Sequence, residues 1–311
     1  MISLRYHAVS IAAVFLALAV GVVLGSAGVS DRLLSAVSHE ADDLAGQVET
    51  LRTERDDLAA GQRAADEFAR RVGPAAVRGL LQGSSVTLVT SGAEPADRDA
   101  VLALLQQAGA SVGGEVALTP AVGDPARADQ LRELAAELLP TGAQLPAATD
   151  TGSLVGGLLG GLVLTPAGSQ PTQPIAPQDA DAVLAGLAAA GFVAPGARPQ
   201  PGNVVLVLTG GALPGVDGGD AAAVVARLAA QLDRVGGGAV LAGRTGSADA
   251  TGAVGVARAD PGIAAGISTV DDVQSGAGQV SAVLALREQL DGRAGSYGTA
   301  ATASGGAAPA A

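Results

Sequence analysis

The strongest constraint on this chain is an apolar stretch near its N-terminus. No residue from Ala8 to Leu24 is charged, and only Ser10 among them is polar. At the helical rise of ~1.5 Å per residue the stretch spans roughly 26 Å, close to the hydrocarbon thickness of a bilayer. Residues 1–27 are therefore predicted to be a single-pass transmembrane anchor. Because Arg5 precedes the stretch, the positive-inside rule places the N-terminus in the cytoplasm and the C-terminal domain outside it.

A cleaved signal sequence is the alternative interpretation of residues 1–27, with the cut near Gly25-Ser26-Ala27. We favour the anchor because the apolar run exceeds the usual length of a signal-peptide core and the next segment reads as a continuing helix. Gly21 and Gly25 form a G-x-x-x-G pair, which allows two spanning helices to pack closely. In a chain with 45 glycines, a chance match is the simpler explanation of that pair.

Residues 28–73 are predicted to form a coiled-coil helix. Apolar residues recur at heptad spacing until Arg55 interrupts the pattern, and we call six of them the seam: Leu34, Val37, Leu44, Val48, Leu51 and Leu58. A helix that is polar on its other faces needs a partner along such a seam, and a parallel homodimer is the simplest one. The alternative is an amphipathic helix that lies on its own globular domain. Gly73-Pro74 is predicted to end the helix.

Residues 75–291 are predicted to form an α/β domain. Strands are expected at 86–90, 116–119, 203–209, 239–242, 254–257 and 266–270, and helices at 96–108, 125–139, 178–190, 219–235 and 279–290. This alternation favours an open, mostly parallel, flavodoxin-like sheet with flanking helices. The glycine-rich segment Leu154–Leu164 is predicted to be a buried helix whose glycines permit close packing. Residues 140–153 and 165–177 are expected to be loops, and residues 292–311, rich in Gly, Ala, Ser and Thr, a disordered tail.

The residue inventory excludes several kinds of chemistry. The chain has no Cys and no Lys, and its two histidines, His7 and His39, both precede the α/β region. Ser-His-Asp and Cys-His arrangements, disulfides, thiolate metal sites and the phosphate-binding P-loop are therefore excluded from that region. The net charge of −12 without a basic cluster argues against a nucleic-acid partner. We expect neither an enzyme nor a bound cofactor.

Open parallel sheets bind ligands at the carboxyl ends of their strands. Four residues at these predicted ends are candidates for a cleft: Ser91, Gly210, Arg244 and Asp271. Arg244 is a candidate clamp for an anion. The simpler alternative is that Ser91 and the strand-end aspartates cap helices and that Arg244 pairs with one of those aspartates. Asp217 and Asp220 are either a weak site for a hard cation or ordinary turn residues.

Particular sequence blocks resemble a known family. The opening MISLRYHAVSIAAVFLALAVGVVLGS of residues 1–26, the closing LREQL of residues 286–290 and the GSYG of residues 295–298 are similar to the actinobacterial copper-transport protein B (MctB) family. The order of parts also resembles that family over nearly the whole chain. The resemblance implies a cell-envelope protein of copper transport or homeostasis, in a family sometimes placed in the outer membrane as channels.

The residues themselves limit how such a protein could handle copper. Cu(I) prefers sulfur ligands and Cu(II) prefers imidazole, yet the chain has no Cys, one Met and two His. No metal site is therefore expected in the α/β domain. A single spanning helix encloses no pore, and the strands lack the alternating pattern of an outer-membrane barrel. We expect a membrane-anchored, non-catalytic, oligomeric protein. The alternative is an envelope scaffold that docks other envelope proteins without copper chemistry, and a degenerate enzyme ranks last.

Overall fold

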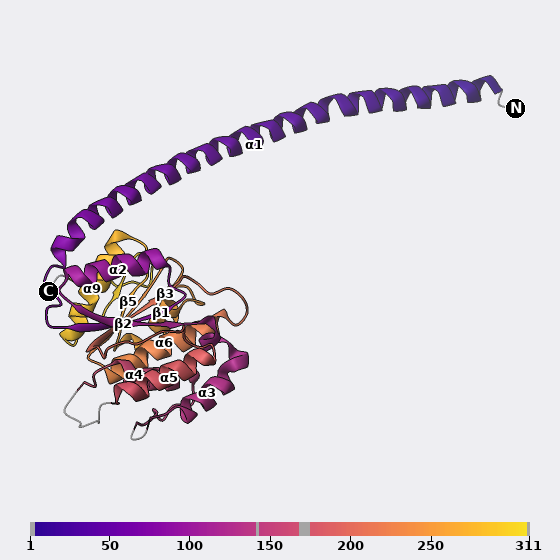
Figure 1. Cartoon of the computed structure of the whole chain (residues 1–311). Coiled ribbons are helices and arrows are strands. Elements are labelled where there is room, and N and C mark those ends of the chain that lie inside the picture. Colours follow the sequence, from indigo (N-terminus) through magenta and orange to yellow (C-terminus); the bar gives the residue numbers. More distant parts are fainter. Residues whose placement is uncertain (1–3, 141–142, 168–174, 310–311) are drawn as a thin grey trace. The chain divides into compact units, whose positions relative to one another are not determined.

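The computed structural model describes residues 4–140, 143–167 and 175–309. The chain divides into two compact units, Met1–Arg63 and Ala64–Ala311, which are described separately below. Helix α1 (Leu4–Ala76) makes up the described part of the first unit and extends into the second (Figure 1). From Leu4 onward, one continuous helix covers both the predicted anchor, residues 1–27, and the predicted coiled-coil segment, residues 28–73. It ends at Ala76, two residues beyond the predicted end at Gly73-Pro74, although Pro74 has no N–H to donate to the helix.

The apolar part of α1 lies at its start. Arg5–Gly25 is long and apolar enough to cross a membrane, a property that N-terminal signal sequences share. Farther along, the described seam side chains from Val37 to Leu58 are between 44% and 75% exposed. The side chain of Leu34 lies outside the described part of the structure. Because a single chain cannot show pairing between copies, the coiled coil stays a prediction.

The second unit is built on a six-stranded sheet whose strands are all parallel, in the order β2-β1-β3-β4-β5-β6. The strands are β1 (Ser85–Ser91), β2 (Ser111–Leu118), β3 (Val204–Thr209), β4 (Ala239–Gly243), β5 (Ser268–Val270) and β6 (Ser296–Tyr297). This arrangement confirms the predicted open parallel α/β fold. Strand β2 begins earlier than the expected 116–119, since Gly113 and Gly114 concealed its first half.

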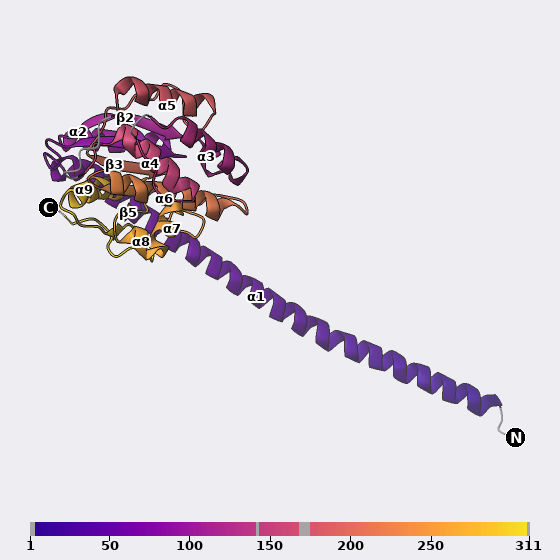
Figure 2. The ribbon, with the colours of Figure 1, turned by 90° about the horizontal axis from the view of Figure 1, so that it is seen from below.

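Helices cover both faces of the sheet (Figure 1). Helices α2 (Pro95–Gln107) and α9 (Gly276–Leu290) pack on one face. The other face carries α3 (Ala128–Glu137), α4 (Thr151–Val163), α5 (Pro177–Ala189), α6 (Gly218–Val235) and α7 (Ala253–Ala259). The short helices η1 (Pro120–Gly123) and η2 (Pro125–Arg127) precede α3, and α8 (Pro261–Ala264) follows α7 near β5 (Figure 2).

The central strand β3 shows why both faces must be covered. All six of its residues are buried. Leu206 and Leu208 join the core beneath α2 and α9, whereas Val205 and Val207 join the core beneath α4 and α6. A strand that is apolar on both faces is stable only between two layers of helices.

The glycines of α4 allow it to lie very close to α6, as the sequence predicts. A Cβ atom at Gly156 would sit 2.9 Å from the carbonyl oxygen of Leu228, and one at Gly160 would sit 3.0 Å from Val235. Gly152 also lies against α6. The spacing of four residues places these three glycines on one helix face, where the backbones approach each other.

The sequence prediction was wrong in two places. Residues 254–257 were expected to form a strand but lie in helix α7. A short apolar run fits either a strand or a buried helix turn, and the burial of Val254 and Ala257, three residues apart, shows the helical spacing.

The second error concerns the tail. Residues 292–311 were expected to be disordered, yet β6 (Ser296–Tyr297) pairs with β5 and Tyr297 is buried. The structure describes this segment up to residue 309, and the last two residues lie outside the description. The small residues of this segment show no apolar periodicity from which a strand could be predicted. The segment is held instead by polar contacts, which are described below.

We predict that Gly156→Ala destabilises the protein and that Gly161→Ala does not. The new methyl group at position 156 would lie 2.9 Å from a backbone oxygen of α6. Such overpacking costs about 1–3 kcal/mol of stability, which exceeds the gain of about 1 kcal/mol from the higher helix propensity of alanine. At Gly161 the nearest atom is a side-chain carbon of Ile175 at 3.4 Å, so the propensity gain remains. Urea unfolding of the full chain in detergent measures both. Equal stabilisation by the two substitutions would contradict the close contact.

Candidate functional site

The carboxyl ends of the strands form the candidate site, because the strand order reverses there between β1 and β3. Register places Ser91, Thr209 and Gly243 side by side at this edge. A cavity of about 320 Å³ opens at the reversal, and its lining includes Ser91, Thr119, Asp124, Leu213, Pro214 and Asp217. Ser91, one of the four predicted cleft candidates, is among the residues that line this cavity. It does not cap α2, whose N-cap position is Glu94.

The carboxylates around this cavity do not converge on a cation. Asp124 accepts a hydrogen bond from the backbone of Ala126 at 2.9 Å, and Asp217 is exposed. Asp220 lies in the first turn of α6 and lines a neighbouring cavity together with Arg132 and Arg227. Within the described residues, no three His, Asp or Glu side chains are grouped so as to hold a metal ion. The cation interpretation of Asp217 and Asp220 gains no support from this geometry.

Gly210 brings three strand ends together. Its carbonyl oxygen accepts a hydrogen bond from the backbone of Arg244 at 3.3 Å, and a Cβ atom on it would lie 2.9 Å from the carbonyl oxygen of Gly92. Gly210 and Arg244 are thus neighbours, as expected for residues at adjacent parallel strand ends.

Arg244 pairs with acidic residues, but not with the strand-end aspartates. Its Nε atom lies 3.1 Å from Oδ2 of Asp97, and its Nη1 atom lies 3.7 Å from Oε1 of Glu94. Both partners come from the start of α2, which the sequence analysis did not connect to β4. The expected pairing with a strand-end aspartate is therefore wrong, and two carboxylates already occupy Arg244, which weakens its role as an anion clamp.

Burial raises the pKa of Asp97 above its ordinary value. Arg244 acts in the opposite direction and lowers it, while the nearby Glu94 raises it. The Asp97 side chain is 9% exposed, so the loss of hydration outweighs the attraction of the guanidinium. Asp233 and Asp272 also have raised pKa values, for the same primary reason of burial.

Asp271 is buried in an ion pair rather than exposed in a cleft. Its Oδ2 atom lies 2.6 Å from Nη1 of Arg258, and the two side chains are 2% and 4% exposed. Asp271 Oδ1 accepts hydrogen bonds from the backbone N–H groups of Thr299 and Ala300, at 2.8 and 3.1 Å. Asp271 therefore holds the C-terminal segment in place and is not available to a ligand.

The same ion pair explains why the tail is ordered. Arg258 also donates to the carbonyl oxygen of Tyr297 at 2.8 Å. Gly298 has φ +128° and lies directly against the Asp271 carboxylate, where a side chain would not fit. The Tyr297 hydroxyl lies 2.8 Å from both carboxylate oxygens of Glu288, and its pKa is far above the ordinary value because of burial and this hydrogen bond.

Sequence reasoning missed Arg258 and Asp97, which determine what Asp271 and Arg244 can do. Arg258 directly follows the segment 254–257 that was predicted to be a strand, and Asp97 reads as an ordinary acidic residue in a first helical turn. The one available signal was the GSYG block at residues 295–298, because an aromatic residue is unusual in a disordered tail.

Comparison with known proteins gives a consistent result. The family model described as "Copper transport outer membrane protein, MctB" matches residues 1–307. A protein named Copper transporter MctB from Mycobacterium tuberculosis (strain ATCC 25618 / H37Rv) is 44% identical over 306 residues, which cover 96% of each chain. The protein of the same name from Mycobacterium leprae (strain TN) is 41% identical over 311 residues, again 96% of each.

We predict that Arg258→Met costs about 3–5 kcal/mol of the free energy of unfolding, because it leaves a buried carboxylate without its cation. The matched control is Arg287→Met, which removes an arginine from the more exposed pair with Asp291 and is expected to cost less than about 1 kcal/mol. Urea unfolding of the full chain measures both. Similar costs for the two variants would show that the ion pair does not hold the tail.

Proposed function

This chain belongs to the MctB family of copper transport proteins, and we propose that it acts as a membrane-anchored, non-catalytic component of copper transport in the cell envelope. The single observation that carries this proposal is the family match, which spans residues 1–307. The absence of a histidine, cysteine or lysine from the α/β region supports the non-catalytic part, since histidine is the most frequent general base and cysteine and lysine are frequent nucleophiles.

Residues 1–27 act in this proposal as an uncleaved single-pass anchor that leaves the α/β domain outside the cytoplasm. The continuity of α1 supports it, because the helix passes through the segment around Gly25 without a break. A signal peptidase site is normally extended and rich in small residues, whereas this site would lie within a helix.

Copper is cargo in this proposal and is not held by the α/β domain. The one Met is residue 1, and neither His belongs to that domain. A dimer would not supply a site either: His39 follows the seam residue Val37 by two positions, roughly 200° around the helix, and so faces away from a partner. Copper selectivity would then reside in a partner or in the assembled complex.

The seam provides the means of assembly. Its described side chains are 44–75% exposed, and apolar side chains at heptad spacing favour association with a second helix. Two copies anchored in the same membrane leave it in the same direction, so they would pair in parallel, as heptads of this kind do.

A scaffold function without copper chemistry is the second candidate. The observation that favours it is the lack of soft copper ligands in the sequence, together with an exposed apolar loop at the switch-point cavity, where Val216 is fully exposed. Copper content of cells distinguishes the two functions.

We expect this chain to restore the parental copper content of an actinobacterial strain that lacks its own family member, measured by mass spectrometry of washed cells grown with added copper. The purified full chain should nevertheless bind neither Cu(I) nor Cu(II) tightly in competition titrations, because it lacks the ligands. His39→Ala is the matched variant and should restore copper content equally. Failure of the wild-type chain to restore it, at normal protein levels, would favour the scaffold, and a submicromolar copper site would contradict the ligand argument.

The oligomeric state tests the seam. Replacing Leu44 and Leu51 with Asp places two charges in each helix of the pair, and we expect a dimer of the full chain in detergent to become monomeric, as measured by multi-angle light scattering. The control replaces Thr50 and Thr53 with Asp, which adds the same charges outside the seam and should leave the dimer intact. A monomeric wild-type chain would rule out pairing through the seam.

A further inference from the structure

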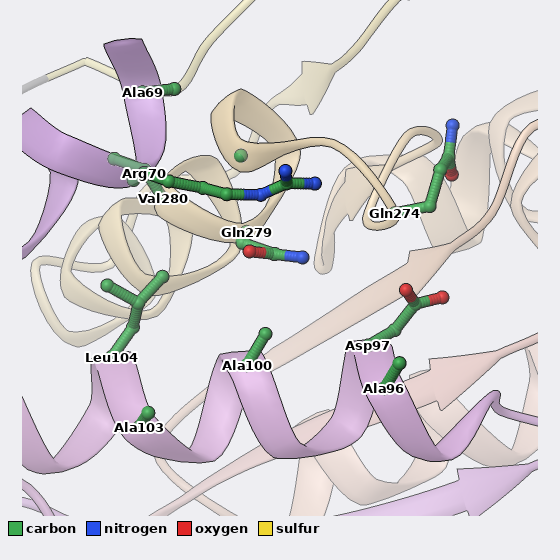
Figure 3. Close-up of a pocket in the computed structure, with 11 residues that line it drawn as sticks. Ala69, Arg70, Ala96, Asp97, Ala100, Ala103, Leu104, Gln274, Gln279 and Val280 are labelled. Carbon is green, nitrogen blue, oxygen red and sulfur yellow. The ribbon is translucent and has the colours of Figure 1, made fainter. Parts of the chain in front are cut away.

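A second cavity, separate from the one at the switch point, lies among the last turns of α1, the start of α2 and the start of α9 (Figure 3). Its volume is about 340 Å³, within the range of small-molecule sites. Much of its wall is made of small side chains, namely Ala69, Ala96, Ala100 and Ala103. These alanines leave space that larger side chains on the same helix faces would fill.

One polar side chain faces this space. Gln279 is only 6% exposed as a residue, and it lines the cavity. Figure 3 shows the amide projecting into the cavity beneath the side chain of Arg70. An amide at this position can donate to and accept from a bound polar molecule.

Opposite charges stand on two sides of the same cavity. Arg70 extends its guanidinium into the space (Figure 3). Asp97 rises from α2 toward the same space (Figure 3). Its Oδ2 atom lies 3.1 Å from Nε of Arg244 but accepts no hydrogen bond in the described part of the chain.

Two charged side chains line the cavity, Arg70 on α1 and Asp97 on α2. A ligand with a single charge could pair with only one of them. A molecule that carries one charge of each sign could form charge-assisted hydrogen bonds with both.

We propose that this cavity binds a small zwitterion of the size of an amino acid or a dipeptide. The ammonium group of the ligand contacts Asp97, its carboxylate contacts Arg70, and the Gln279 amide donates to or accepts from the polar atoms between them. The alanines accept a short aliphatic side chain. This binding is independent of copper and of the switch-point cavity, so its test does not depend on the function proposed above.

Three probes of similar size test the charge requirement: L-alanine, propionate, which lacks the ammonium group, and ethylamine, which lacks the carboxylate. Saturation-transfer difference NMR on the full chain in detergent should show saturable binding of alanine, with propionate and ethylamine at least tenfold weaker. No saturable binding of alanine, or equal binding of either single-charge probe, would overturn the proposal.

Two variants locate the site. Arg70→Gln and Asp97→Asn should each weaken alanine binding at least tenfold, because each removes a charge-assisted contact. Their matched controls, Arg198→Gln and Asp99→Asn, change exposed residues outside this cavity and should bind alanine as the wild type does. Thermal unfolding verifies that each variant is folded, and Arg70 is exposed, so its loss should not affect folding. Unchanged binding in folded Arg70→Gln would place alanine elsewhere and overturn the assignment.

Discussion

The burial of strand β3 on both faces is the constraint on which the α/β domain depends. A strand made of valines, leucines and one threonine cannot face water on either side, so the neighbouring strands must be parallel and the crossovers must place helices on both faces. The close contact of α4 with α6 follows from this requirement, because α6 lies directly on the sheet and α4 reaches the same core through its glycines. The carboxyl edge, where the cavities open, is the part that helices leave uncovered.

Patterns of apolar residues predicted most of this fold. The parallel sheet, the helices that flank it and the glycine-rich α4 all carry periodic or uninterrupted apolar runs, which are the signals that sequence reasoning uses best. The sequence prediction failed where polar contacts decide the structure. Strand β6 has two residues, and its position depends on Arg258 and Asp271, which lie 13 residues apart in the sequence and come from different elements.

In the candidate site, too, the positions of residues were predictable from the sequence but their polar contacts were not. Ser91, Gly210 and Arg244 meet at the sheet edge because parallel strands end together, which is a property of topology that alternating elements reveal. What each side chain does there depends on residues from other elements. Asp97 on α2 binds Arg244, and Arg258 on α7 binds Asp271, so one candidate is neutralised and the other is buried. A single sequence offers no means of finding such partners, because their distance along the chain is unrelated to their distance in space.

The composition of the chain also restricts how a member of a copper transport family can act on copper. A protein that binds Cu(I) directly requires thiolate or thioether ligands in an arrangement that the fold holds in place. Here the side chains that the fold holds most firmly are carboxylates paired with arginines, which are poor ligands for Cu(I). Under the proposed function, the α/β domain therefore contributes shape and charge rather than metal ligands. In the same proposal, α1 connects the domain to the membrane and to a second copy. The seam of α1 is an extended apolar surface that the described part of this helix exposes beyond the span Arg5–Gly25.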